Sequence, residues 1–80
     1  MKMEEKKIRR NLYRVLRKTG VQKKDISPEA SFDNDLKFDS VDWTIFTFYL
    51  EGVFDISVSD EKLLSLKDVN EAVTFLKHTA

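Results

Sequence analysis

Residues 36–42 read Leu-Lys-Phe-Asp-Ser-Val-Asp, and they stand where a polar loop gives way to a long apolar run. Asp39 and Ser40 have side chains that accept hydrogen bonds from the free N–H groups of a helix's first turn. We therefore expect a helix to begin at Ser40, with the serine hydroxyl exposed at its start, and to continue to Val53. Because a serine in such a place is commonly a helix cap, the residue by itself does not indicate chemistry.

The predicted helix over 40–53 is apolar around most of its circumference. With about 100° per residue, its apolar side chains form a wide arc and, across a narrow polar stripe, a second strip. This apolar strip consists of Val41, Ile45 and Phe48. A chain of 80 residues cannot cover such a helix on every side. We expect the apolar strip to remain accessible as a contact surface.

The segment before the motif predicts one amphipathic helix and a long loop. Over residues 4–19, apolar side chains fall on one helical face, namely Ile8, Leu12, Val15 and Leu16. The connection over residues 21–39 is long for a compact domain, and such loops are often functional or anchored. Three isolated apolar residues are expected to pin it to the helices: Ile26, Phe32 and Leu36.

The segment after the motif predicts two further helices. Ser59-Asp60-Glu61 is a cap signal for one short helical turn, and Ser65 with Asp68 resembles a capping box for the last helix. That helix has an apolar face formed by Val69, Ala72, Val73 and Leu76. Residues 1–80 are thus expected to form a single all-α domain. It would be a small three-to-four-helix bundle with a long first loop and a short extra helix before the last.

The composition excludes several kinds of site. The chain has no cysteine, which excludes a thiolate nucleophile and a Cys-type zinc site. Asp33, Asp35 and Asp39 lack the glycine and the terminal glutamate of a calcium loop, so no metal site is expected. No stretch reaches the roughly 18 apolar residues that span a bilayer. We expect a cytoplasmic protein without stable membrane insertion, and a chain this short favours a binding or carrier module over an enzyme with a deep site.

Charge is unevenly distributed although the formal net charge is zero. Residues 1–24 hold ten Lys and Arg against two Glu, and residues 25–80 hold twelve Asp and Glu against four Lys. We interpret this as a basic first helix that lies near acidic loops of the same domain, which needs no nucleic-acid partner. A nucleic-acid-binding basic helix remains an alternative, although no second helix follows closely enough for a helix-turn-helix.

These features together resemble the acyl carrier proteins over nearly the whole chain, from about Ile8 to Leu76. Residues 36–42 are similar to the family's L-G-x-D-S-L-D motif. The similarity continues without a gap through three further segments: Phe54-Asp55-Ile56, Ser59-Asp60-Glu61 and Leu66-Lys67-Asp68-Val69.

The resemblance implies a function for the motif serine. Ser40 would carry 4′-phosphopantetheine as a phosphodiester, and Asp39 would help to position the serine and the metal ion of the modifying transferase. The chain would be a carrier and not an enzyme, holding acyl groups as thioesters for fatty acid, lipid or polyketide-type synthesis. Its partners would be a phosphopantetheinyl transferase and the enzymes that load and use the acyl group, and the carrier itself would be a monomer.

Several residues depart from the family pattern and suggest a specialised carrier. Lys37 replaces a common glycine, Val41 replaces the motif leucine, and the helix after Ser40 contains only Asp42 and Glu51 as acidic residues. Carriers of bulk fatty acid synthesis usually present glutamates there to basic patches on their partners. We therefore predict that partner enzymes recognise this chain through an apolar surface. The predicted recognition residues are Val41, Asp42, Thr44, Ile45 and Phe48. A peptidyl or aminoacyl carrier and an unmodified helical interaction module are the alternatives.

Overall fold

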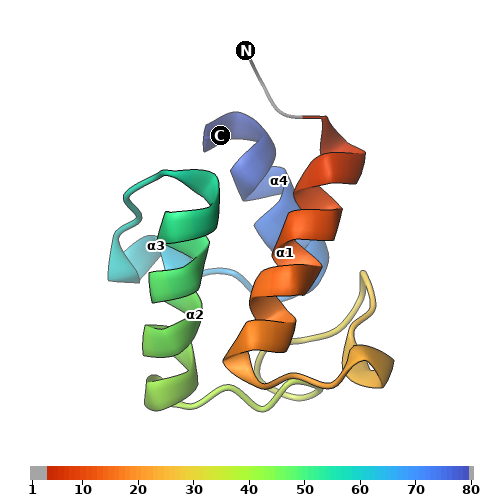
Figure 1. Cartoon of the computed structure of the whole chain (residues 1–80). Helices are drawn as coiled ribbons and strands as arrows, with labels where there is room; N and C mark the ends of the chain where they lie inside the picture. Colours follow the sequence, from red (N-terminus) through yellow and green to blue (C-terminus); the bar gives the residue numbers. More distant parts are fainter. Residues whose placement is uncertain (1–3, 80) are drawn as a thin grey trace.

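The computed structural model describes residues 4–79, and these residues form four α-helices and one 3-10 turn (Figure 1). The elements are α1 (Glu5–Thr19), η1 (Lys23–Asp25), α2 (Ser40–Phe54), α3 (Asp60–Leu64) and α4 (Val69–Thr79). Over the described range the only extended pairing is a single antiparallel bridge between Ser31 and Asp68. The all-α prediction, including the long first loop and the short third helix, is confirmed.

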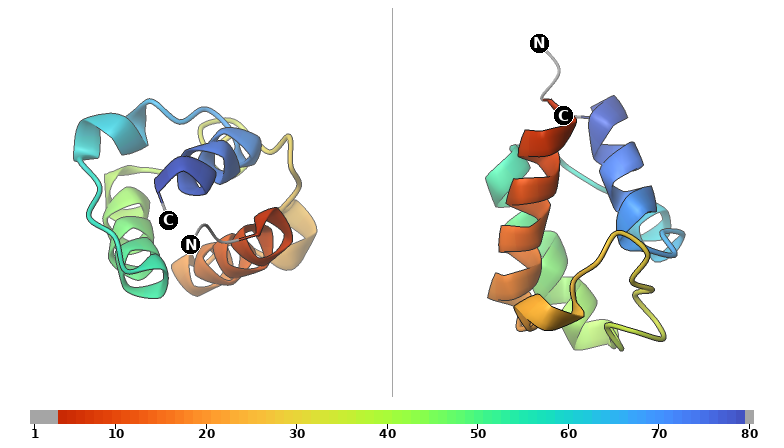
Figure 2. Two further views of the ribbon diagram at one scale, coloured as in Figure 1. Left: turned by 90° about the horizontal axis from the view of Figure 1, so that it is seen from above. Right: turned by 90° about the vertical axis from the view of Figure 1, so that its right-hand side faces the viewer.

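Three long helices enclose the core. In Figure 1, α1 runs downward and α2 upward beside it, so the end of α1 and the start of α2 lie at the same end of the molecule. The third long helix, α4, packs against α1, and α3 lies beside α2, diagonally across the bundle from α1 in the view from above (Figure 2). No helix in the described part of the chain is long and apolar enough to cross a membrane.

The periodicity of the sequence correctly identifies the buried faces. The α1 face expected from the sequence is fully buried, and α4 contributes Val69, Ala72, Val73 and Leu76 to the same core. From α2 only every fourth residue is fully enclosed, at Phe46, Leu50 and Phe54. Val53, which the sequence places in the wide apolar arc, is nevertheless 38% exposed.

The loop over residues 20–39 is anchored to the core by one aromatic side chain above all. Phe32 is 1% exposed, whereas Ile26 and Leu36 are half-buried against the core. The backbone N–H of Phe32 also donates to the carbonyl of Lys67, and the N–H of Val69 donates to the carbonyl of Ala30. These bonds fasten the loop to the start of α4, and the anchoring role predicted for Phe32 is confirmed.

The cap of α4 differs from its predicted form. The carboxylate of Asp68 accepts the N–H of Glu71, and the Glu71 carboxylate accepts the N–H of Lys67. The Ser65 hydroxyl instead donates to the carbonyl of Lys62 at the end of α3. The predicted box of Ser65 with Asp68 is therefore wrong, because the box lies one turn further along the chain and joins Asp68 to Glu71.

The two halves of the charge distribution do not neutralise each other through ion pairs. Within residues 4–79, the ion pairs are Arg9 with Glu5 and Lys77 with Glu5. The hydrogen bond and charge of Lys77, with the charge of Arg9, hold the pKa of the Glu5 carboxyl below its ordinary value. The expectation that acidic loops lie against the basic face of α1 is thus not met at ion-pair distance.

Candidate functional site

The start of α2 is held by a reciprocal pair of side chains on either side of Ser40. The Asp39 carboxylate accepts the N–H of Asp42 at 2.9 Å, and the Asp42 carboxylate accepts the N–H of Asp39 at 3.1 Å. This capping box satisfies two backbone donors at once and fixes where the helix begins. Asp39, and not Ser40, is therefore the N-cap of α2.

The hydroxyl of Ser40 has no structural partner. It is exposed, and it forms no hydrogen bond with any residue of the described chain, while the Ser40 carbonyl accepts the hydroxyl of Thr44 at 2.9 Å. The backbone N–H groups of Ser40 and Val41 also lack an acceptor within residues 4–79. A hydroxyl and two N–H donors are thus left open at the positive end of a 15-residue helix, which favours an anion beside the hydroxyl.

A surface groove starts at this hydroxyl and follows the gap between α2 and α3. Its volume is about 400 Å³, and its lining residues are Ser40, Trp43, Thr44, Thr47, Asp60, Leu63 and Leu64. The hydroxyls of Thr44 and Thr47, two of the lining residues, donate to the helix carbonyls of Ser40 and Trp43 one turn back. The groove offers an apolar wall of Trp43 and the α3 leucines together with a few hydrogen-bond acceptors.

Behind Ser40, a cluster of four aromatic rings fixes the approach of the loop to α2. Phe32 lies 5.3 Å from Phe38, 5.0 Å from Trp43 and 5.7 Å from Phe46, measured between ring centroids. Tilted and edge-to-face ring contacts at such distances add about 0.5–1.5 kcal/mol each beyond area burial. The rings place the loop residue Phe38 against the first two turns of α2, and this contact positions the Asp39–Ser40 junction.

The loop that leads into α2 also contains one strained backbone conformation. Lys37 adopts a φ of 54°, which is left-handed and costs a side-chain-bearing residue roughly 1 kcal/mol or more. Glycine would adopt this conformation without the penalty. The structure thus gives a physical reason for the glycine that the acyl carrier motif commonly has at the Lys37 position.

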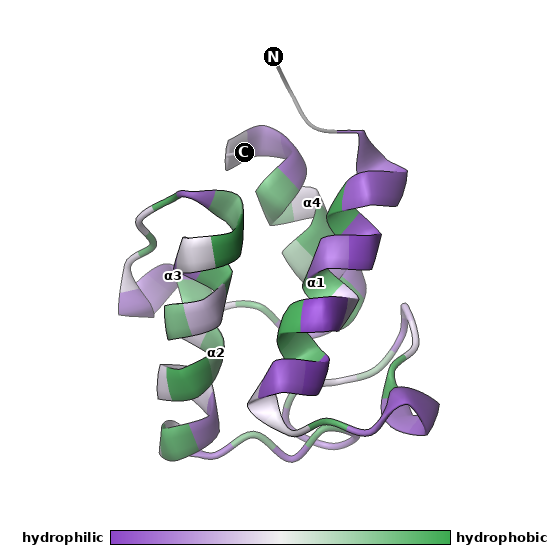
Figure 3. Ribbon diagram, viewed as in Figure 1, coloured by the Kyte–Doolittle hydropathy of each residue, from purple (hydrophilic) through white to green (hydrophobic). Residues whose placement is uncertain are grey.

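The predicted contact residues are divided between different sides of α2. Val41, Ile45 and Phe48 form one strip and Thr44 lines the groove beside Ser40, whereas Asp42 is half-buried in a pocket with residues 19–22 at the end of α1. Val41 is 62% and Phe48 is 73% exposed, and Ile45 between them is half-buried. Much of α2 is green along its length in Figure 3, whereas purple segments recur along α1. The prediction that the apolar strip remains accessible is confirmed for Val41 and Phe48.

The acidic side chains of α2 are both engaged within the molecule. Asp42 belongs to the capping box, and the Glu51 carboxylate accepts the N–H of Val58 at 2.8 Å. The sequence did not indicate the second contact, because Val58 lies beyond the end of the helix. A partner that approaches α2 therefore meets an apolar strip with few free carboxylates.

The comparisons with known proteins agree with this geometry. Residues 14–76 match the family described as "Phosphopantetheine attachment site". The chain is similar to the acyl carrier protein of Chlorobium phaeobacteroides, with 33% identity over 75 residues that cover 92% of this chain and 96% of the relative. It is also similar to the acyl carrier proteins of Karelsulcia muelleri (42% over 62 residues, 74% and 75% covered) and Chlorobium luteolum (35% over 75 residues, 92% and 96% covered).

Proposed function

The chain belongs to the acyl carrier protein family, and on that premise we propose that Ser40 is the residue to which its arm is attached. Members of this family are carriers and not enzymes, they bear a covalent 4′-phosphopantetheine, and they work with a phosphopantetheinyl transferase and other partner enzymes. The observation that carries the proposal is the Ser40 hydroxyl, which is exposed and unbonded because Asp39 performs the capping.

The residues around Ser40 fit the attached group. The open N–H groups of Ser40 and Val41 would hold the phosphate, aided by the positive end of the α2 dipole. The groove wall of Trp43, Leu63 and Leu64 would shelter the apolar parts of the arm. When bound, the group supplies a terminal thiol, which this cysteine-free chain lacks and which forms thioesters with acyl groups.

The proposed cargo is an acyl group for fatty acid, lipid or polyketide-type synthesis, carried by a specialised rather than a housekeeping member. Support for a specialised role comes from α2, which presents Val41 and Phe48 to solvent while Asp42 and Glu51 are engaged internally. An exposed aromatic side chain with apolar neighbours is typical of a protein contact surface. Asp39 and Thr44 flank the attachment point and would be covered by the same partners.

Charged substitutions in the apolar strip are expected to weaken partner recognition. Changing both Ile45→Glu and Phe48→Glu places two carboxylates where a partner would bury apolar area, so kcat/KM for loading by the transferase of the same organism should fall about tenfold or more. Thr74→Glu, which adds one carboxylate at an exposed position on α4, is the control for added charge outside the strip. An unchanged kcat/KM in the correctly folded double variant would contradict the role of the strip.

The mass of the intact protein distinguishes a carrier from an unmodified interaction module. After incubation with coenzyme A and a broad-specificity phosphopantetheinyl transferase, we expect every molecule to gain the mass of one phosphopantetheine. No gain would favour the interaction module. The mass of the group found on the arm in the native host would then separate an acyl cargo from an aminoacyl or peptidyl one.

A further inference from the structure

We propose that a groove between α1 and η1 is a second docking surface, which binds an acidic helical segment of a partner protein. The groove has a volume of about 470 Å³, and its lining residues are Arg10, Tyr13, Arg14, Arg17, Lys18, Lys23 and Ile26. It lies apart from the α2–α3 groove and shares no residue with it. The inference therefore does not depend on the attachment of an arm to Ser40.

The positive charge of this basic groove is not neutralised within the described chain. None of its five cations forms an ion pair with a residue of 4–79, and Lys18 lies instead over the ring of Tyr49, 5.5 Å from its centroid. By contrast, Arg9 on a neighbouring face of α1 contacts Glu5 and Asn70. The cations that line the basic groove have no ion-pair partner in the described chain, so a ligand with several negative charges would neutralise them.

The spacing of the cations points to a helical ligand. Arg10, Arg14 and Arg17 recur at i, i+4 and i+7, so they form a row along one side of α1 about 10 Å long. A helix lying along this row presents its own carboxylates at the same repeat. The half-buried side chains of Tyr13 and Ile26 supply an apolar floor between the cations, which suits the apolar side chains of an amphipathic helix.

Two other polyanions fit the basic groove less well. A membrane-binding groove would call for exposed apolar side chains among its cations, but the apolar residues that line the basic groove, Tyr13 and Ile26, are half-buried. Single-stranded nucleic acid would call for successive aromatic platforms, and the basic groove holds only Tyr13. An acidic amphipathic segment of a protein would contact both the cations and the apolar floor of the basic groove.

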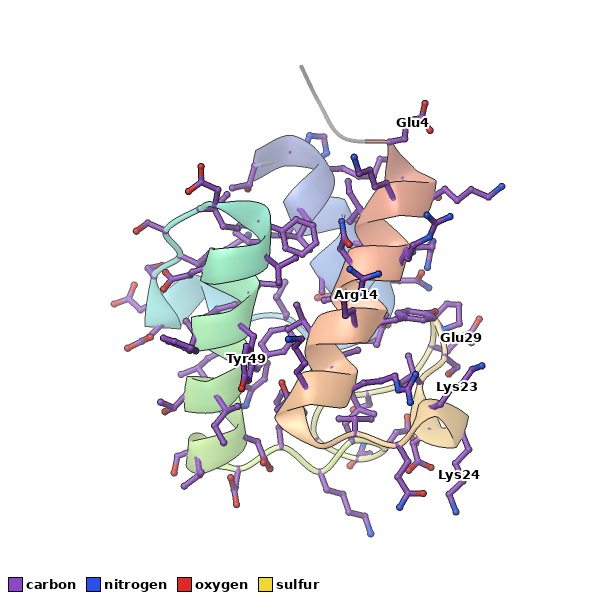
Figure 4. All side chains as sticks on the ribbon, in the orientation of Figure 1. Glu4, Arg14, Lys23, Lys24, Glu29 and Tyr49 are labelled. Atoms are coloured by element: carbon purple, nitrogen blue, oxygen red, sulfur yellow. The ribbon has the colours of Figure 1, made fainter. Side chains whose placement is uncertain are left out.

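The basic groove continues into the proposed contact face of α2. Lys18 contacts the Tyr49 ring, whose centroid is 5.5 Å from that of Phe48 on the apolar strip. Figure 4 shows Arg14 on α1 with Tyr49 across on α2, and Lys23 on the turn beyond the end of α1. One partner can thus contact both elements, with apolar side chains on α2 and carboxylates on α1, which reverses the charge pattern expected for bulk carriers.

A synthetic amphipathic peptide tests this inference directly. The probe is a helical peptide with Glu at i, i+4 and i+7 and a stripe of Leu beside them, titrated into the full-length ¹⁵N-labelled chain. We expect amide shifts along 10–26 and an affinity that falls as salt is raised. Arg10→Glu with Arg14→Glu should weaken binding about tenfold or more. Lys6→Glu with Lys7→Glu makes the same charge change outside the groove and should have a much smaller effect.

Exchanging the charges of the peptide and of the groove distinguishes specific binding in the groove from general electrostatic attraction. A peptide with Lys in place of Glu should bind the Arg10→Glu, Arg14→Glu variant more tightly than it binds the unmodified chain. Equal weakening by the control pair at Lys6 and Lys7 would overturn the inference. So would tighter binding of a single-stranded oligonucleotide, or of phosphatidylglycerol vesicles, than of the acidic peptide at equal negative charge.

Discussion

Ser40→Ala is expected to abolish the gain in mass that a phosphopantetheinyl transferase produces, and to leave the fold intact. The gain in mass should be lost completely, because no other hydroxyl is placed beside open N–H groups at the start of α2. Thr44 lies one turn along the helix, and its hydroxyl donates to the Ser40 carbonyl. The free energy of unfolding should change by no more than about 0.5 kcal/mol, since the Ser40 hydroxyl bonds to nothing in the described chain.

Ser59→Ala is the matched control for this experiment. Ser59 is also an exposed serine at a helix start, but its side chain accepts the N–H of Lys62 and caps α3. Its removal should cost about 1 kcal/mol of stability while the gain in mass is retained. A Ser40→Ala protein that is still loaded, or that loses stability as a capping variant does, would contradict the assignment of a free attachment hydroxyl.

Phe32→Ala is expected to destabilise the domain by about 3–5 kcal/mol in urea unfolding. Phe32 is 1% exposed and touches three other rings, so its removal leaves a cavity that Phe38, Trp43 and Phe46 cannot fill without shifting. A domain of 80 residues has roughly 4–12 kcal/mol of stability in total. The variant should therefore be largely or partly unfolded at physiological temperature.

Phe48→Ala provides the contrasting phenylalanine. Phe48 is 73% exposed, so its truncation should change the unfolding free energy by about 0.5 kcal/mol or less. In conditions where the Phe32→Ala protein remains folded, the rate at which the transferase loads that protein should also fall, because Phe32 fixes the loop that leads into Asp39 and Ser40. Equal stability of the two variants would contradict the anchoring of this loop by Phe32.

Local sequence patterns were sufficient for the helices and most of the core. The 3.6-residue repeats of Ile8 to Leu16 and of Val69 to Leu76 predict buried faces that the structure confirms. The cap of α3 by Ser59 was likewise predictable, because a cap and its helix are adjacent in the chain. The isolated apolar Phe32 indicated an anchored loop, although not the ring cluster that holds it.

The sequence could not predict which of two neighbouring side chains caps a helix when both are able to. Both Asp39 and Ser40 are good caps, and only the backbone geometry decides that Asp39 accepts the N–H of Asp42. The same holds for Asp68, which pairs with Glu71 in place of Ser65. These choices matter for function, because the cap at Asp39 is what leaves the Ser40 hydroxyl free.

The distribution of unpaired charge also required the structure. The sequence shows that the first helix is basic and the remainder acidic, and mutual neutralisation was the simplest interpretation. Ion pairing needs side chains within 4 Å, and the fold brings only Glu5, Arg9 and Lys77 to that distance within residues 4–79. The basic groove on α1 is a consequence of helix packing that composition alone could not reveal.

The attachment residue can be located directly by peptide fragmentation. The protein is isolated from its own host, cleaved, and the peptide that bears the phosphopantetheine is fragmented to find the modified side chain among the six serines of the chain. We predict one arm per molecule, located on Ser40. An arm on any other residue, or a native protein that carries none, would contradict the proposed function of this site.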